Sequence, residues 1–201
     1  MASTATPYGL RAVNELGGLP YAGSTRTFLI DPAGYNTNIF NGSIVCVNAA
    51  GYLEIVTTVG SSAGNIFPAG TIGVFVGCSF VNAQGQTMYS QYYPANTTGV
   101  VQALVIDDDR TVFQVQAAGT LAQAALGQNA ILQAVQSTST GSTTTGNSTT
   151  AISISTNTTA TYGLKIIGFV QSTTSTVGDA YTDVLVKFNI GSHAYNTGTG
   201  I

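Results

Sequence analysis

His193, the single histidine of this 201-residue chain, is the first side chain to consider for chemistry, because imidazole can act as a general base or metal ligand near neutral pH. It lies in "GSHAYNTGTG", a glycine-rich stretch. A catalytic triad or a metal site needs partners that are held rigidly, and we expect residues 191–201 to form a flexible tail. The sequence therefore predicts no catalytic role for His193.

Three consecutive carboxylates, Asp107, Asp108 and Asp109, are the next candidates. Consecutive side chains diverge, whereas a calcium loop needs oxygen ligands at alternating positions with a glycine and a distal glutamate. That spacing is absent here, and the other acidic residues are too dispersed for a pair of catalytic carboxylates. We expect a solvated turn at 107–111 and no metal site.

Nucleophile and phosphate-binding motifs are missing: no glycine loop has the spacing of a P-loop, and no serine has a nucleophile-elbow setting. Cys46 and Cys78 lie in the apolar runs "SIVCVNA" and "VFVGCSF", without histidine neighbours that could complete a zinc site. We expect two buried, reduced thiols that pack as small hydrophobic groups. The sequence thus makes no positive case for an enzyme, a cofactor or a bound metal.

Aromatic side chains gather in and before "SQYYPANTTG", residues 90–99. Because successive side chains on a strand point to opposite faces, Tyr89, Tyr92 and Tyr93 cannot all enter one core. Either one tyrosine is buried and the others cover the end of a barrel, or the others contact another subunit. Uncharged aromatic rings with polar tips suit a hydrated protein interface better than a catalytic pocket.

Composition favours an assembly component. Charged residues make up 6% of the chain, against about 25% in an average soluble domain, and the net charge is −3. A protein with so little surface charge is weakly repelled from its neighbours; an extracellular domain rich in Ser and Thr is the alternative. The few, scattered basic residues argue against nucleic-acid binding. No apolar run is long enough to span a membrane, and the N-terminus does not resemble a signal peptide, so we expect synthesis in a cytoplasm.

Strands must position these residues. Runs rich in Val, Ile and Phe, separated by Gly, Asn, Asp or Pro, predict strands within 42–49, 51–58, 70–81, 100–107, 111–117, 151–156, 162–172 and 181–190. Alternation gives Val184, Val186 and Phe188 a purely apolar face. Turn residues predict tight turns within 47–53 and 82–86. We therefore expect an all-β fold, a small β-barrel or sandwich forming a single domain over 36–190.

One short helix is expected within 120–132. Thr120 is the predicted N-cap, Leu121 and Leu126 are predicted to pack on the sheet, and Gly127 is predicted to end the helix.

Two segments lack regular patterning. The Ser/Thr-rich stretch 136–161 is either a flexible linker or a hairpin, and the alternating "AISIS" within it favours a hairpin with a mobile tip near 139–148. Residues 1–35 contain few periodic apolar positions, and we expect an extended arm that crosses a neighbouring molecule.

A family resemblance emerges from four stretches taken in order: "ATPYGLRAVNELGGLPYAG", "SQYYPANTTG", "TVFQVQA" and "GDAYTDVLVKFNI". Together they resemble the capsid decoration (cement) proteins of tailed bacteriophages, especially of marine and cyanobacterial phages, over about residues 5 to 190. The middle region more distantly resembles the small barrel, or β-tulip, of lambda-type decoration proteins. The Ser/Thr-rich stretch is longer than a minimal lambda-like barrel needs.

The resemblance implies a non-catalytic virion protein on the outer surface of an icosahedral capsid. Such proteins bind shells of HK97-like major capsid protein, commonly as homotrimers, and bridge neighbouring capsomers. An N-terminal arm, here residues 2–20, would add a strand to the capsid protein. The residues expected to contact the capsid or another subunit are Pro7, Tyr8, Leu10, Arg11, Tyr89, Gln91, Tyr92, Tyr93 and Pro94.

Two other functions compete with this one. The chain could be another virion part, such as a head fibre or a tail component, or a carbohydrate-binding β-sandwich whose tyrosines stack on sugars. Lectins usually place carboxylates or a calcium site beside such aromatics, and neither accompanies Tyr89–Tyr93 in the sequence.

Overall fold

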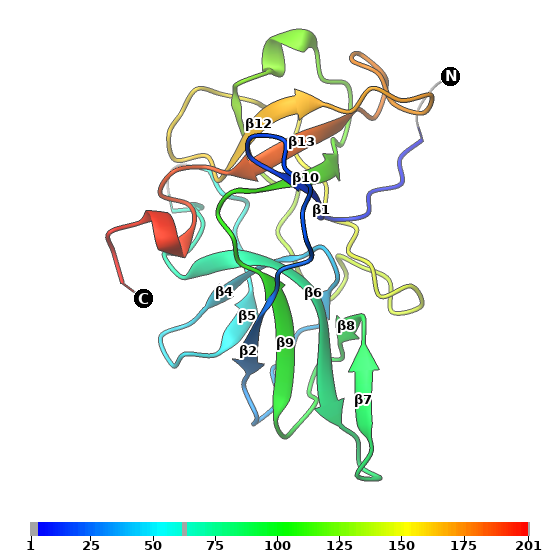
Figure 1. The fold of residues 1–201 in the computed structure, drawn as a ribbon, viewed down its shortest axis with the longest axis vertical. Coiled ribbons are helices and arrows are strands. Elements are labelled where there is room, and N and C mark those ends of the chain that lie inside the picture. The colour runs from blue at the N-terminus through cyan, green and yellow to red at the C-terminus, as the bar shows by residue number, and fades with distance from the viewer. Residues whose placement is uncertain (1–3, 62–63, 201) are drawn as a thin grey trace.

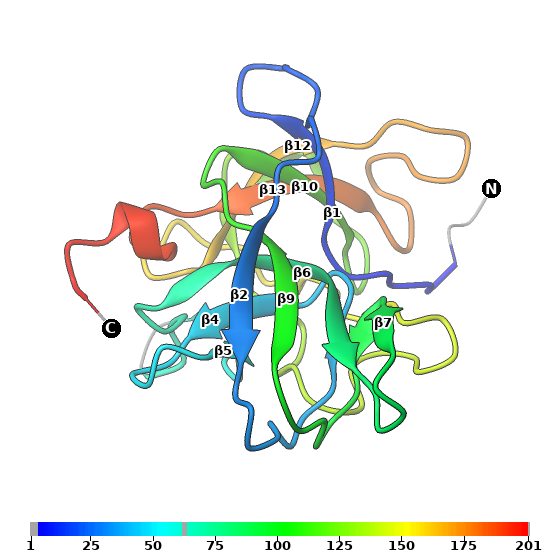
Figure 2. The ribbon, with the colours of Figure 1, turned by 60° about the horizontal axis from the view of Figure 1, so that its bottom comes forward.

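Two β-layers form the molecule, which the computed structural model describes over residues 4–61 and 64–200. Figures 1 and 2 show a sheet above a barrel. The five-stranded upper sheet has the order β1-β10-β13-β12-β11, and every neighbouring pair is antiparallel. Its strands are β1 (Arg11–Glu15), β10 (Thr111–Gln116), β13 (Asp183–Phe188), β12 (Leu164–Phe169) and β11 (Asn129–Ala130).

The lower layer is a closed barrel with one added strand. Its order is β4-β5-β2-β9-β6-β7, and an additional β4–β6 pairing closes the ring. The strands are β4 (Ile44–Val47), β5 (Leu53–Ile55), β2 (Arg26–Ile30), β9 (Val101–Ile106), β6 (Thr71–Val81) and β7 (Thr87–Ser90). A short pair, β3 (Ile39–Phe40) and β8 (Tyr92–Tyr93), completes the layer. The predicted all-β fold with a small barrel is confirmed.

The barrel wall has two buried faces. Along β4, Val45 points into the barrel interior, whereas Ile44 and Cys46 belong to the core between barrel and upper sheet. On β6, Phe75 likewise points into the barrel interior, and Val74 belongs to the core between barrel and upper sheet. Because both faces are buried, these strands read as continuous apolar runs in the sequence. This wall is what joins the two layers.

Most predicted strands are present within one to three residues of their expected limits. The apolar face of Val184, Val186 and Phe188 is fully buried, as predicted. The run 151–156 forms no strand; Ile152 makes isolated bridges to Ala117 and Leu132 instead and is buried between them.

The predicted N-terminal arm is wrong over most of its length. β1 pairs with β10, and β2 pairs with β9 inside the barrel. The domain therefore begins well before residue 36. β1 has no fully buried position and β2 has one, so they lack the apolar alternation that marks strands in a sequence. Their place is determined by backbone pairing with distant segments.

The predicted helix is reduced to a single 3₁₀ turn, η1 (Gln123–Ala125). Ala122, not Thr120, precedes it, and no side chain caps it. Leu121 is buried as expected, but Leu126 is exposed. Gly127 has a left-handed backbone, φ +81°, and its amide bonds the carbonyl of Ile166 on β12. Tertiary bonding thus ends the turn before a longer helix forms.

The Ser/Thr-rich stretch is a folded loop with little regular structure. Its tip closes through a bridge between Gly141 and Ser148, consistent with a hairpin-like turn. The backbone of Asn41 holds the tip against the barrel. Its N–H donates to the Gly146 carbonyl, and its carbonyl accepts the Ser148 backbone N–H. Gln136, buried near the start of the stretch, bonds the backbone of Ile44. Side-chain and backbone bonds, not apolar periodicity, hold this loop.

Candidate interaction surfaces

The N-terminal contact residues predicted from the sequence divide between core and surface. Leu10 is buried among both layers, so its predicted role in a contact is wrong. Tyr8 is half-buried and its hydroxyl donates to Asp183 Oδ1 over 3.1 Å. Arg11 is exposed, and its guanidinium carbon lies 4.5 Å from the centre of the Tyr8 ring. Pro7 is half-buried in a hollow of about 230 Å³ lined mainly by small side chains.

Electrostatics around Tyr8 follow from burial. Desolvation raises the pKa of the Asp183 carboxyl, and the hydrogen bonds from Tyr8 and Gln114 together with the charge of Arg11 oppose that rise. Desolvation and the nearby Asp183 charge likewise raise the pKa of the Tyr8 hydroxyl. Tyr8 therefore stays neutral and remains a hydrogen-bond donor at any physiological pH.

The tyrosine cluster also divides. Tyr89 on β7 has 81% of its surface exposed, whereas Tyr93 on β8 is fully buried, so its predicted contact role is wrong. The Tyr93 hydroxyl donates to the backbone carbonyls of Tyr35 and Thr97. Tyr92 is half-buried and stacked on Phe40, with ring centres 5.6 Å apart. This arrangement combines both sequence interpretations: one tyrosine is in the core, one covers it, and one faces solvent.

A kink separates the exposed tyrosine from the buried ones. The Ser90 hydroxyl bonds the backbone of Tyr92, which ends β7 and turns Gln91 outward. Pro94, half-buried, follows β8 and accepts the Thr97 hydroxyl and amide at its carbonyl. The alternation expected for one continuous strand is therefore broken at Gln91.

One outward face of the barrel carries no charge. Cross-strand register places alternate residues of β2, β9, β6 and β7 on this face. Its members are Thr27, Leu29, Gly77, Ser79, Val81, Thr87, Tyr89, Gln102 and Leu104. Leu29, Val81 and Leu104 expose 46%, 56% and 39% of their surface. We call these residues the uncharged face.

The uncharged face ends at an open strand edge. β7 is the last strand of its sheet and, among the described residues, pairs only with β6. The hairpin of β6 and β7 turns at Asn82–Gln86, where the Asn82 amide bonds the Gln86 carbonyl, and it extends from the lower end of the molecule in Figure 1. An open edge beside exposed apolar side chains is a hazard for a free monomer and a means of binding for an assembly subunit.

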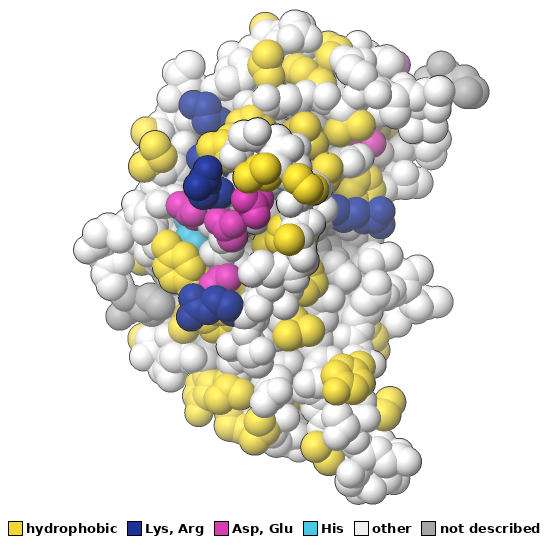
Figure 3. All heavy atoms as spheres, viewed as in Figure 1, with side chains coloured by type: hydrophobic (Ala, Val, Ile, Leu, Met, Phe, Trp, Pro, Cys, Tyr) yellow, Lys and Arg dark blue, Asp and Glu magenta, His cyan; other side chains and the backbone are white. Residues whose placement is uncertain are grey.

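A polar cleft lies between the barrel and the upper sheet. It measures about 380 Å³ and is lined by Leu10, Arg11, Ala12, Tyr21, Asn41, Val76, Gln91, Ile106 and Asn147. Two segments that the sequence analysis singled out, around Arg11 and around Gln91, thus meet in one place. Figure 3 shows the molecule hollowed on its right side, with a basic side chain on the upper rim. Asn41 and Asn147 were not predicted, because only the fold brings them here.

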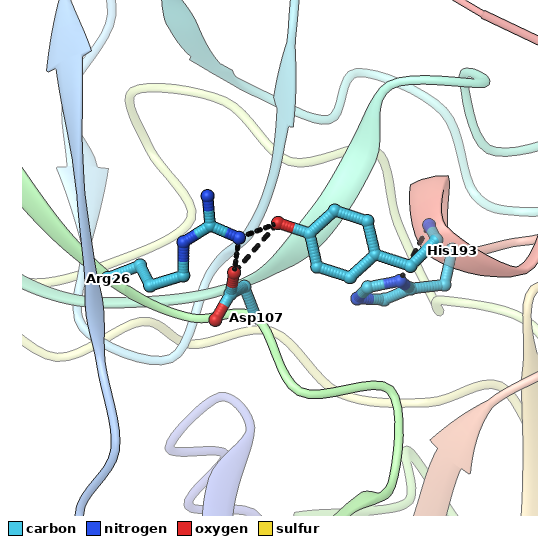
Figure 4. A network of polar contacts seen from close by, with 4 residues as sticks. Arg26, Asp107 and His193 are labelled. Carbon is cyan, nitrogen blue, oxygen red and sulfur yellow. Dashed lines mark hydrogen bonds and ion pairs between the residues drawn. The ribbon is translucent and has the colours of Figure 1, made fainter.

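The C-terminal segment is anchored to the barrel by a polar network, shown in Figure 4. Asp107, nearly buried at the end of β9, accepts the Tyr195 hydroxyl at 2.8 Å and pairs with Arg26 at 2.9 Å. His193 is 1% exposed and caps the 3₁₀ turn η2 (Ala194–Asn196) by accepting the Tyr195 amide at Nδ1. The prediction of a flexible tail is therefore wrong for this segment, and Asp107 is not part of a solvated turn.

The contacts of this network hold the C-terminal segment in place. Burial lowers the pKa of His193, and the backbone of Ile72 and then the carboxylates of Asp109, Asp107 and Asp108 oppose that change. The imidazole is held between the rings of Phe188 and Tyr195. Over 4–61 and 64–200, no three His, Cys, Asp or Glu side chains come close enough to hold a metal ion.

Both cysteines are buried, as predicted, and are not linked to each other. Desolvation raises the pKa of each thiol to about 12. Cys46 lies in the core between the layers and Cys78 inside the barrel. A protonated, buried thiol is a poor nucleophile.

Comparisons with known proteins add no relative. No protein-family model, no curated protein and no solved structure matches this chain. Within the described residues, no helix has the length and apolarity to cross a membrane.

Proposed function

We propose that this chain is a structural virion protein that decorates the outer surface of a tailed-phage capsid and bridges neighbouring subunits without catalysis. The observation that best supports this role is the uncharged face with its open β7 edge. Exposed Leu29, Val81 and Tyr89 would be unfavourable on a free monomer but suit the centre of a protein interface, where charge is depleted and tyrosine enriched.

The open edge supports the same proposal. A strand from a capsid subunit, or from a second copy of this chain, would pair with β7 through main-chain hydrogen bonds and cover Tyr89. A homotrimer at a three-fold axis would present several such edges at once, and the multiple contacts would add avidity. The N-terminal segment contributes less than the sequence suggested, since β1 and β2 are already paired within the molecule.

Carbohydrate binding is the weaker candidate. Tyr89 is exposed enough to stack on a sugar, but no carboxylate lies on the uncharged face around it. Lectin sites commonly combine an aromatic ring with acidic hydrogen-bond acceptors. Loss of glycan-array binding on Tyr89→Ala would favour this alternative.

Co-sedimentation tests the proposal. The purified chain is mixed with expanded shells assembled from the HK97-like major capsid protein of the genome that encodes it, with unexpanded shells as the control. We expect saturable binding to expanded shells, and light scattering after size exclusion should give the mass of a trimer. A chain that stays in the supernatant at micromolar concentration contradicts the proposal.

A further inference from the structure

The polar cleft has walls of two kinds. Leu10 and Ile106, both buried, form part of an apolar floor. The polar residues of the lining are Arg11, Tyr21, Asn41, Gln91 and Asn147. A small number of polar groups placed around an apolar floor is typical of a binding site.

Several of these polar groups lack partners in the described part of the chain. The side-chain amides of Gln91 and Asn147 make no hydrogen bond there, whereas the Asn41 Nδ2 donates to the Val76 carbonyl over 3.3 Å. Each free amide offers two N–H donors and one acceptor oxygen. Donors are therefore available side by side, from the Ser/Thr-rich loop and from the kink after β7, because the Gln91 side chain lies against Gly146, the residue before Asn147.

Arg11 is the one charged residue of the lining. Over the described residues it forms no ion pair, and its guanidinium is held against the Tyr8 ring. Asp183 lies near enough to feel its charge, but that carboxylate is bonded by Tyr8 and Gln114. The guanidinium edge thus keeps unused N–H donors, and stacking on the ring limits its orientations.

From this arrangement we infer that the cleft binds a single carboxylate, a Glu or Asp side chain presented by a partner protein. A guanidinium matches a carboxylate with two parallel hydrogen bonds, and the free amides of Gln91 and Asn147 would complete its coordination. The cleft contains one basic residue, and the chain as a whole has a net charge of −3. Such a site does not suit a polyanion such as nucleic acid, which requires clustered basic residues. The identity of the partner as a capsid subunit rests on the proposed function.

An NMR titration tests the inference. The probe is the tripeptide acetyl-Ala-Glu-Ala-amide, and acetyl-Ala-Gln-Ala-amide is its neutral match. We expect the Glu peptide to shift the side-chain resonances of Arg11, Gln91 and Asn147 saturably, with a millimolar dissociation constant, and the Gln peptide to leave them unchanged. Arg11→Gln should weaken binding by about tenfold or more, whereas Arg110→Gln, at another exposed arginine, should bind as the wild type does.

Arg11 is exposed, so Arg11→Gln should fold normally, which its amide spectrum verifies. Equal shifts with both peptides, or equal shifts with methyl α-glucoside, overturn the inference. Co-sedimentation with shells distinguishes failure of this inference from failure of the proposed function. Shell binding without peptide binding would reject the carboxylate site and leave the proposed function in place. Peptide binding without shell binding keeps the site and removes the capsid as its partner.

Discussion

The Tyr195 hydroxyl donates a 2.8 Å hydrogen bond to Asp107 Oδ2, across 88 residues of sequence. This contact joins the end of the chain to the last residue before the turn from barrel to upper sheet. Asp107 also pairs with Arg26 of β2, so three distant segments meet at one carboxylate.

Removing that hydroxyl should loosen the C-terminal segment. Tyr195→Phe keeps the ring but leaves Asp107 with one donor fewer, and we expect a loss of about 1 kcal/mol in the free energy of unfolding. Urea denaturation gives the stability, and hydrogen exchange should quicken at residues 192–197. Tyr89→Phe is the matched control, because Tyr89 is exposed. An unchanged exchange rate in Tyr195→Phe would show that the segment is held by packing alone.

Stability should fall in mild acid because of His193. Its folded-state pKa is lowered by burial, so between that value and the ordinary 6.5 the unfolded chain binds more protons than the folded one. The free energy of unfolding therefore decreases as pH falls below 6.5, with a slope of at most about 1.4 kcal/mol per pH unit. Thermal unfolding from pH 7.5 to 5 measures it.

His193→Asn is the control for this prediction. Asparagine retains an acceptor for the Tyr195 amide but does not titrate, so the slope between pH 7 and 5 should flatten even though the variant starts from a lower stability. Asp183, whose pKa is raised, contributes a slope of opposite sign at lower pH. A slope that persists in His193→Asn would assign the pH dependence to another group.

Leu10 should behave as a core residue. Leu10→Ala leaves a cavity between the two layers, and we expect a loss of about 2–5 kcal/mol in the free energy of unfolding. Leu19→Ala, at an exposed leucine in the neighbouring loop, should change stability by less than about 0.5 kcal/mol. Chemical denaturation compares the two. Similar losses of stability in both variants would contradict the assignment of Leu10 to the core.

Tyr89 should matter for assembly and not for folding. Tyr89→Ser removes an exposed ring from the uncharged face, so the melting temperature should stay within about 2 °C while shell binding weakens by about tenfold or more. Co-sedimentation and calorimetry measure the two effects. Tyr162→Ser, at a tyrosine away from this face, serves as the control for binding. Full shell occupancy by Tyr89→Ser would exclude this face from the contact.

Gly73 should be irreplaceable. A Cβ at this position would lie 1.9 Å from the Ile106 carbonyl oxygen, and φ is +150°. Gly73→Ala must therefore separate β6 from β9, and we expect loss of soluble folded protein. Gly85→Ala, in the open hairpin turn, meets no neighbour and should cost about 1 kcal/mol. Circular dichroism and yield distinguish the two; a folded Gly73→Ala would contradict the close approach.

Sequence patterning predicted the elements whose own side chains form the cores. β13 alternates between buried and half-buried positions, β10 is buried at five of its six positions, and the turn predicted within 47–53 contains Gly51 with φ +84°. β1, β2 and the anchored C-terminal segment were missed, because their positions depend on pairing with residues far along the chain. Leu10 and Tyr93 were assigned to contacts for the same reason, since neither lies in a periodic apolar run.

Only two polar residues of the candidate cleft, Arg11 and Gln91, were singled out from the sequence. Arg11 and Gln91 were singled out separately, in the stretches "ATPYGLRAVNELGGLPYAG" and "SQYYPANTTG". Their meeting depends on the kink at Ser90 and on the Ser/Thr-rich loop, which contributes Asn147. A polar loop without periodicity gives no sign of where it lies.

The double-sided wall of β4 and β6 has a calorimetric consequence. Val45 and Phe75 serve the interior of the barrel, while Ile44 and Val74 serve the core beneath the upper sheet. If one core melted alone, the side chains of β4 and β6 that had packed in it would be exposed to water, while the other face of the same strands stayed buried. The two layers should therefore melt together, in one endotherm whose van't Hoff and calorimetric enthalpies agree.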